Sequence, residues 1–505
     1  MVEISTTTKI FTLSIFALYV IVLLGIGWYS NKKQKNTSLN KFVDEFYTGG
    51  RGMGALVVGL MVGASICSAG TFIGGPALGT KEGLVWTVVI YSSVMMNFFI
   101  LSLVGKKIGI MVRRTNIVSY TGLLRDRYDN NRIVGILAPV AIIILLIPYC
   151  VSQFVGGARL FELMTGLDYM WGLAIFGIVI FIYAIFGGIR GVSLSAVLQG
   201  FAMTVAVLGL LFGVLTYINV HNGGLEAACK VLAANGELAH IIDPNHWTIQ
   251  KTFSFMFLNG IAFIGLPHSV QATFIYKNTK SIHSAIVVGL VFVTMWQGIM
   301  TFMGPASRMM GMSLNIADQT TPALAVTTLP PAVAGVILAG AVGAIQSTVA
   351  SMLLIISASA AKDLFKTYVR PKASNETMKK ATYVITAGIL VVILAFAVNP
   401  PAFLQAIINF ALGGLESAFF CPLLLGLYWK KANEYGCIAS MGGGLLYYLL
   451  ATIVPSMAFG LQPVVPSCIV SILGMIIVSL LTPHSTRGTI MRWFGKKYPI
   501  YEEVR

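Results

Sequence analysis

The sequence predicts an all-α polytopic membrane protein with about thirteen transmembrane helices. Three observations predict this class: the composition, the spacing of the apolar segments and the placement of the basic residues. Apolar residues make up 56% of the 505 residues and charged residues only 10%, whereas an ordinary soluble domain has roughly 25% charged residues. Glycine is frequent, at 52 residues, as is common where transmembrane helices pack closely. Little of the chain is therefore left for soluble domains.

The apolar segments are long enough to cross a bilayer, which takes about 20 predominantly apolar residues per helix. The first segment is too long for the apolar region of a signal peptide, and its basic flank follows it, so we expect it to be retained. The expected spans lie near residues 9–30, 53–79, 84–104, 133–156, 169–187, 191–218, 252–275, 284–307, 331–361, 380–397, 401–428, 434–454 and 464–482.

The basic residues alternate between successive connecting segments. If the N-terminus lies outside, the inside segments hold 28 of the 34 Lys and Arg residues and the outside segments hold 6. Because cytoplasmic loops collect Lys and Arg, this split indicates an odd number of spans in the cell membrane, with the N-terminus outside and the C-terminus cytoplasmic. The net charge of +16 then reflects topology and does not indicate a nucleic-acid partner.

The order of the spans suggests two related halves. We divide the chain into the first helix with its cytoplasmic loop, a first repeat of helices 2–6, an extracellular loop, a second repeat of helices 7–11, and helices 12–13 with a cytoplasmic tail. These parts cover residues 1–52, 53–218, 219–251, 252–428 and 429–505. Because each repeat has an odd number of spans, the second is inverted relative to the first. Inverted repeats are a transporter architecture with the binding site near mid-bilayer.

The first span of each repeat is interrupted by glycine and proline. Span 2 reads GLMVGASICSAGTFIGGP and span 7 reads FLNGIAFIGLPHSV. Interrupted spans at matching positions of two halves point to a substrate site, although Gly and Pro are also common in transmembrane helices generally. We expect the site beside these two interruptions.

Few ionisable residues lie inside the spans. All seven Asp fall in loops or at span ends, and of the eleven Glu only Glu416 lies well inside a span. A charged carboxylate there is costly, so Glu416 is protonated, paired, or in contact with a wet cavity. It serves either the substrate or coupling ion, or a hydrogen bond between helices. No His/Asp/Glu metal set or Ser–His pair lies within the spans and the six Cys lack metal spacing, so we do not expect an enzyme.

Adjacent hydroxyl residues mark span 9, where Ser347 and Thr348 follow Ala344 by about one turn. Facing unwound carbonyls of the segment Gly63–Gly70, they could complete an oxygen cage for Na⁺. Hydroxyl groups also commonly join transmembrane helices through hydrogen bonds, and spacing alone leaves both interpretations open.

Several motifs occur together in a characteristic order: GASICSAGTFIGGPALGTKEG, QFVGGARLFELMTGLDY, FGGIRGVSLSAVLQG and AIQSTVASMLLIISASAAKDLF. The chain resembles the sodium:solute symporter family from about residue 10 to residue 480. IGLPHSV and LGGLESAFFCPLLLGLYWKKAN resemble its pantothenate-transporting branch. This resemblance implies a thirteen-helix, leucine-transporter-like inverted repeat that imports pantothenate with Na⁺ by alternating access, with a monomer sufficient for transport.

The resemblance also implies the ligands of one Na⁺. Carried over position by position, they are the backbone carbonyls of Ala64, Cys67 and Ala344 and the hydroxyls of Ser347 and Thr348. Some family members hold an additional Na⁺ with an Asp in span 6 and hydroxyls late in the span 9 motif. Here those positions are Ala196, Ala350 and Ser351, so we expect one Na⁺ per transport cycle.

Polar residues beside the interrupted spans are the candidate substrate contacts, although each could simply pack between helices. No Lys or Arg lies in mid-membrane, so an anionic substrate would depend on N–H groups at half-helix N-termini, on hydroxyls and on the nearby Na⁺. The candidates are Ser65, Ser68, Thr71, Asn97, Tyr149, Gln153, Asn259 and Glu416.

Other functions stay open at this point. The cargo could be another carboxylate, an amino acid or a sugar, and H⁺ could replace Na⁺ because Glu416 could carry a proton. A channel would need a repeated pore motif or charged rings, and a membrane sensor would need an appended signalling domain. The sequence shows neither feature.

Overall fold

The computed structural model describes residues 5–35, 38, 41–234, 236–243, 246–314, 316–399 and 404–495. The described chain is almost entirely helical and contains no strand. Ten of its helices are long and apolar enough to cross a membrane, or twelve if each of two bent helix pairs is one span. The predicted class, an all-α polytopic membrane protein, is therefore confirmed.

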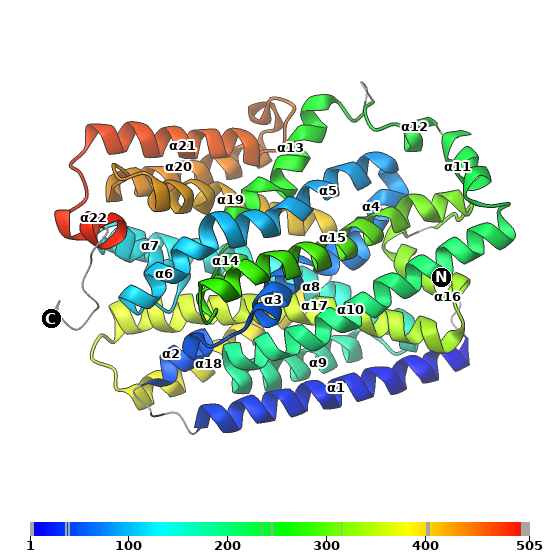
Figure 1. The fold of residues 1–505 in the computed structure, drawn as a ribbon, viewed down its shortest axis with the longest axis horizontal. Coiled ribbons are helices and arrows are strands. Elements are labelled where there is room, and N and C mark those ends of the chain that lie inside the picture. The colour runs from blue at the N-terminus through cyan, green and yellow to red at the C-terminus, as the bar shows by residue number, and fades with distance from the viewer. Residues whose placement is uncertain are drawn as a thin grey trace.

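The helices of the bundle, some of them short segments of a bent span, mostly run along the horizontal axis of Figure 1. In the first half they are α1 (Thr6–Lys35), α3 (Ala55–Ile66), α4 (Gly75–Glu82), α5 (Leu84–Phe98), α6 (Lys106–Thr115), α8 (Arg132–Thr165), α9 (Tyr169–Ile180) and α10 (Phe186–His221). In the second half they are α13 (Ile249–Asn259), α14 (Pro267–Gln271), α15 (Thr279–Met309), α17 (Pro331–Ser357), α18 (Asn375–Ala397), α19 (Leu404–Tyr428), α20 (Glu434–Ile453) and α21 (Val464–Leu481).

Short helices lie in the connections or continue the long ones. The connecting elements are α2 (Phe42–Thr48), η2 (Gly49–Arg51), α7 (Tyr120–Arg127), α11 (Leu225–Ala234), α12 (Gly236–Ala239), η8 (Ala317–Gln319), α16 (Thr320–Thr328), η10 (Pro455–Ala458) and α22 (Arg487–Phe494). The remaining elements adjoin longer helices: η3 (Gly70–Gly74), η4 (Phe99–Gly105), η5 (Phe181–Ile185), η6 (Ile261–Gly265), η7 (Ala272–Phe274) and η9 (Ala358–Val369).

The two predicted interruptions are real bends. Ala55–Ile66 and Gly70–Glu82 meet at 58°, and Ile249–Gly265 and Pro267–Phe274 meet at 44°. The first helix stops because Cys67 takes an extended conformation, with φ −79° and ψ 105°. The second stops at Leu266, with φ −76° and ψ 115°, because the residue before a proline is disfavoured in the α conformation.

One apparent helix, Tyr169–His221, is a folded-back pair. At 53 residues it would be about 80 Å long if straight, far more than the bilayer core of about 30 Å. Its chain reverses at Gly188, whose φ of +55° suits glycine, and Gly191 then packs against the backbone oxygen of Tyr183. Counting the two arms separately agrees with the thirteen predicted spans, and the number that cross the membrane stays a prediction.

The connecting segments separate to the two ends of the bundle. Helices α6, α7 and α22 lie at one end, and α11, α12 and α16 lie at the other (Figure 1). The distribution of Lys and Arg predicted that the first group lies inside the cell and the second outside. The placement of the two groups at opposite ends agrees with this predicted alternation of loops. Which end faces the cytoplasm stays a prediction.

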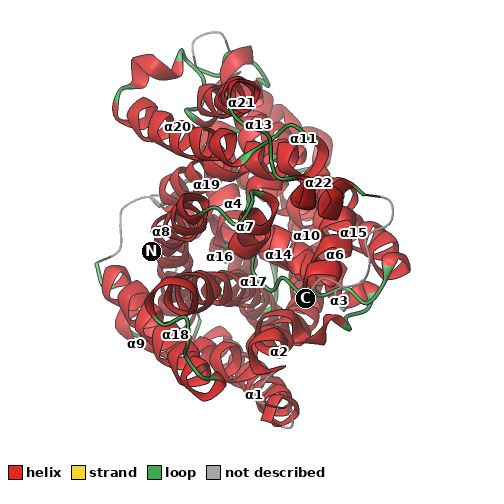
Figure 2. Ribbon diagram, turned by 90° about the vertical axis from the view of Figure 1, so that its left-hand side faces the viewer, coloured by secondary structure: helices red, strands yellow, loops and turns green. Residues whose placement is uncertain are grey.

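The centre of the bundle is formed by α17 and α19. The apolar windows of the spans Pro331–Val369 and Leu404–Tyr428 are each 83% buried, whereas that of the first span is only 22% buried. In the end-on view α17 lies in the middle with α4, α14 and α16 around it, while α1 and the pair α20–α21 lie at the periphery (Figure 2). The central position of α17 brings its hydroxyl residues against the bend in span 2.

Candidate functional site

The bend in span 2 releases backbone groups from helical hydrogen bonding. Helix α3 ends at Ile66 and η3 begins at Gly70, so residues 67–69 belong to neither helix. Buried backbone groups need hydrogen-bond partners. The carbonyls and the N–H groups around this bend have their partners on different neighbouring helices. The carbonyls face α17, and an N–H group faces α8.

Five oxygen atoms from α3, from Cys67 directly after it and from α17 come together on the carbonyl side. Thr348 Oγ1 lies 3.1 Å from Ala64 O, 3.3 Å from Cys67 O and 3.3 Å from Ala344 O. Ser347 Oγ lies 3.0 Å from Ala64 O and 2.7 Å from Ala344 O. These residues are all at least 98% buried. The structure thus brings together all five residues predicted to bind Na⁺, which we call the oxygen cluster.

The chemistry of the oxygen cluster suits a monovalent cation. Three carbonyls and two hydroxyls are hard, uncharged oxygen donors of the kind that discontinuous helices offer to Na⁺ in transporters. In the described part of the chain no three His, Cys, Asp or Glu residues form a metal-binding group. Its role as a Na⁺ site stays a prediction, because the contacts also satisfy a plain hydrogen-bonded joint between helices.

The positions that hold an additional Na⁺ in some family members lack the oxygen ligands found in the oxygen cluster. Ser351 Oγ donates to Ser347 O of its own helix at 3.0 Å, and Ser195 Oγ donates to Gly191 O at 2.6 Å. Ala196 and Ala350 offer no side-chain oxygen. These hydroxyls are committed within their helices, and among the described residues no carboxylate is hydrogen-bonded to them.

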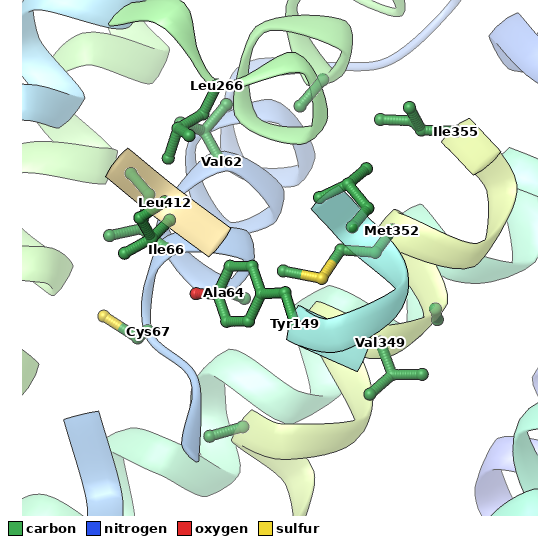
Figure 3. Packing of buried hydrophobic residues seen from close by; sticks show 14 of the residues in the cluster. Val62, Ala64, Ile66, Cys67, Tyr149, Leu266, Val349, Met352, Ile355 and Leu412 are labelled. Carbon is green, nitrogen blue, oxygen red and sulfur yellow. The ribbon is translucent and has the colours of Figure 1, made fainter. Parts of the chain in front are cut away.

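A cavity opens beside the same bend, with an empty volume of about 450 Å³ including open solvent. Four predicted substrate contacts line it: Ser68, Thr71, Tyr149 and Asn259. Tyr149 Oη lies 3.5 Å from Ser68 Oγ. Figure 3 shows the Tyr149 ring beside Ile66 and Leu412, which line the same cavity.

The other four predicted contacts do not line the cavity. Ser65 Oγ donates to Val62 O of its own helix at 2.7 Å, and Asn97 packs against Gly289 of α15. Gln153 Oε1 accepts from the Ala69 N–H of the bend at 2.8 Å. Glu416 is fully buried in α19, and neither of its carboxylate oxygens has a hydrogen-bond partner among the described residues. Whether any of the eight candidates contacts the substrate stays a prediction.

The N–H groups at the bend are already occupied, in contrast to the expectation that they would hold an anion. Ser68 N donates to Thr71 Oγ1 at 3.3 Å and Gly70 N to Ser68 Oγ at 3.1 Å. Ala69 N is bound by Gln153, as described above. An anionic ligand would therefore have to displace these side chains or use other donors.

Five further polar or amphipathic side chains line the cavity that the sequence interpretation missed: Trp86, Ser93, Gln297, Thr301 and Gln405. Gln297 and Gln405 lie within or at the start of apolar spans, and the rule that singled out Asn97 would have found them. Trp86 gave no signal, because an aromatic residue in an apolar span is usually a packing residue. No charged side chain lines the cavity.

Nearly the whole chain is similar to known proteins. A model of the sodium:solute symporter family matches residues 46–444. The chain is 35% identical to the sodium/pantothenate symporter of Escherichia coli K12 and 31% identical to that of Haemophilus influenzae, covering 94% of this chain and 97% of the relative in both cases. The osmoregulated proline transporter of Bacillus subtilis is 26% identical over 95% of this chain and 96% of its own length.

A solved structure shows the same fold. A Na⁺-coupled sialic acid symporter in a substrate-bound outward-open state superposes with a TM-score of 0.76, covering 94% of this chain and 99% of the other at 17% identity.

Proposed function

Because the chain belongs to the sodium:solute symporter family, we propose that it imports pantothenate together with one Na⁺ by alternating access. It is a Na⁺-coupled, multi-pass membrane symporter. In the proposed topology the N-terminus is outside and the C-terminus is cytoplasmic, residues 53–218 and 252–428 are the inverted repeats, and a monomer is sufficient. The observation that carries the proposal is that one helix bend supplies two carbonyls of the oxygen cluster and part of the wall of the cavity.

The bend offers a direct route for coupling. The carbonyls of Ala64 and Cys67 face the oxygen cluster, while Ile66 and Ser68 line the cavity. A Na⁺ in the cluster would fix residues 64–67, and thereby the adjoining cavity wall, in one conformation. Since coupling between two sites is reciprocal, Na⁺ would raise the affinity for pantothenate and pantothenate would raise the affinity for Na⁺.

The energetics are sufficient for uptake with one ion. A Na⁺ moving down about 100 mV releases about 2.3 kcal/mol, and each tenfold Na⁺ gradient adds about 1.4 kcal/mol. Pantothenate is a monoanion at neutral pH, so its charge cancels that of one Na⁺. The Na⁺ concentration gradient alone would then drive accumulation.

One observation, the burial of Glu416, would favour H⁺ in place of Na⁺ as the coupling ion. Its carboxylate has no hydrogen-bond partner among the described residues, and a protonated carboxyl is one state that tolerates such burial. The oxygen cluster favours Na⁺. Na⁺ coupling and H⁺ coupling can be distinguished by which ion gradient drives transport.

Uptake of radiolabelled pantothenate into proteoliposomes tests the proposal. An inward Na⁺ gradient with the membrane potential clamped should give transient accumulation above equilibrium, and an inward H⁺ gradient without Na⁺ should not. Unlabelled pantothenate should compete and proline should not. Accumulation driven by H⁺ alone, or competition by proline and not by pantothenate, would contradict the proposal.

A further inference from the structure

Three polar atoms of the cavity wall have no hydrogen-bond partner among the described residues: Trp86 Nε1, Ser93 Oγ and Gln405 Oε1. Their residues line the same cavity, and all three residues are at least 95% buried. Buried polar groups are normally satisfied, and an orphaned group calls for an explanation. Each atom is closed off in this structure, so a ligand that parts the wall and supplies the missing partners explains all three atoms together.

The three atoms demand different chemistry from that ligand. The indole Nε1 of Trp86 can only donate, and a hydroxyl such as Ser93 Oγ can donate or accept. The amide oxygen of Gln405 can only accept, and its Nε2 is committed to Asn409 Oδ1 at 2.9 Å. An ionised carboxylate only accepts hydrogen bonds, so it matches Trp86 and is repelled by the oxygen of Gln405.

The wall holds other neutral donors, such as the amide of Gln297 and the hydroxyl of Thr71, but no charged donor for a carboxylate. No Lys or Arg lines the cavity. The N–H groups of Ser68, Ala69 and Gly70 at the bend are already bound to side-chain oxygens. Trp86 Nε1 can only donate, and it has no acceptor among the described residues. It is therefore a donor of the wall that suits a carboxylate.

The Trp86 ring is fixed for such a role. It lies on α5 and packs against Trp247 and Phe255, with ring centroids 6.4 Å and 5.8 Å away. Its Nε1 faces the start of α4, where a Cβ on Gly75 would lie 4.0 Å from it. An aromatic ring held by neighbours presents its N–H with little loss of conformational entropy when the ligand binds.

We propose that Trp86 recognises the carboxylate of the transported solute by donating a hydrogen bond from Nε1, while Gln405 Oε1 accepts from a hydroxyl or amide N–H of the same molecule. The inference rests on the proposed function and specifies the substrate class as a hydroxylated carboxylic acid. Pantothenate belongs to this class, since it has a carboxylate, an amide and two hydroxyls.

The test compares pantothenate with pantothenol, which carries a CH₂OH group in place of the carboxylate. Trp86→Phe removes the N–H and keeps an aromatic ring. In proteoliposomes this variant should raise the KM for pantothenate about tenfold or more, as expected for a lost hydrogen bond to a charged group. The inhibition constant of pantothenol should rise clearly less, because its hydroxyl accepts only a neutral hydrogen bond.

Trp247→Phe is the matched control, because Trp247 belongs to the same aromatic cluster but does not line the cavity. Its Nε1 already donates to Glu82 Oε2 at 2.6 Å. This variant should leave the ratio of the pantothenate and pantothenol constants as in the parent protein. If Trp86→Phe does not fold, β-(3-benzothienyl)alanine at position 86, which replaces the N–H by sulfur in a similar ring, provides the same comparison.

The inference is overturned if the parent protein transports pantothenate but loss of the Trp86 N–H leaves its KM unchanged or weakens both ligands equally. Absence of Na⁺-driven pantothenate uptake in the parent protein is a different result, because it refutes the proposed function itself.

Discussion

Replacing Thr348 tests the oxygen cluster more sharply than any other single change. Its Oγ1 lies within 3.3 Å of three backbone carbonyls, from Ala64, Cys67 and Ala344, whereas Ser347 Oγ contacts two. Thr348→Ala removes one of five oxygen donors and leaves the backbone donors in place. Thr348→Ser is the matched control, because it retains the oxygen and loses only a methyl group.

The expected magnitude follows from the lost contact. An interaction with a charged partner contributes about 1.5–3 kcal/mol, and about 1.4 kcal/mol corresponds to tenfold in affinity. The half-saturating Na⁺ concentration of Thr348→Ala should therefore rise about ten- to a hundredfold, and that of Ser347→Ala should rise less. Thr348→Ser should stay close to the parent protein.

Two assays measure this effect. One is the Na⁺ dependence of pantothenate uptake in proteoliposomes. The other is the stabilisation of the purified protein by Na⁺ without substrate. At a Na⁺ concentration about one hundred times the parent Kd, binding should stabilise the parent by about 2.7 kcal/mol, and a variant with hundredfold weaker binding by only about 0.4 kcal/mol. A Thr348→Ala protein with the parent's Na⁺ dependence in both assays would refute the assignment of the cluster.

Three further predictions follow from the contacts described above. Gln153→Leu leaves the Ala69 N–H of the bend without its partner, so the free energy of unfolding should fall by about 1–3 kcal/mol; an unchanged thermal unfolding temperature would contradict this. Pantothenate transport should produce no net current in solid-supported membrane electrophysiology and should depend on Na⁺ with a Hill coefficient near one; a coefficient near two would contradict the single-ion proposal. Burial raises the pKa of Asp129, but hydrogen bonds from Thr486 and neighbouring hydroxyls outweigh it and leave that pKa below its usual range. The ionised form therefore stabilises docking of α22 at all pH values above the unfolded-state pKa of about 3.9, and this stabilisation is lost only as the pH falls through the lower folded value. Asp129→Asn should therefore expose Arg487 and Arg492 to trypsin at neutral pH. Equal cleavage rates of the two proteins would count against this.

Much of the fold could be predicted because its signals are local. Gly188 and the Leu266–Pro267 pair change the backbone direction by their own conformational preferences, and the apolar lengths limit where spans begin and end. Ser347 and Thr348 were predicted from their adjacent hydroxyls and from the family motifs in span 9, as partners of the interrupted segment that follows α3. The structure then placed these residues within hydrogen-bond distance of Ala64 and Cys67.

The cavity wall was harder to predict, because it depends on contacts between distant helices. Gln153 and Trp86 show why, and whether either residue contacts the substrate stays a prediction. Gln153 looked like a substrate contact because it is polar within a span, but its oxygen caps the Ala69 N–H. Trp86 looked like a packing residue, and only the absence of a partner for its Nε1 among the described residues marks it as a candidate contact. Which polar atom is satisfied by a neighbour is a property of tertiary packing.

Movement of ²²Na⁺ driven by pantothenate tests the central claim of one-to-one coupling most directly. Proteoliposomes with equal Na⁺ concentrations on both sides would receive an inward pantothenate gradient while the membrane potential is clamped. Coupled symport predicts net ²²Na⁺ entry although there is no Na⁺ gradient, with one ion for each pantothenate. Uncoupled or H⁺-coupled transport predicts pantothenate entry without ²²Na⁺. The second result would contradict the account.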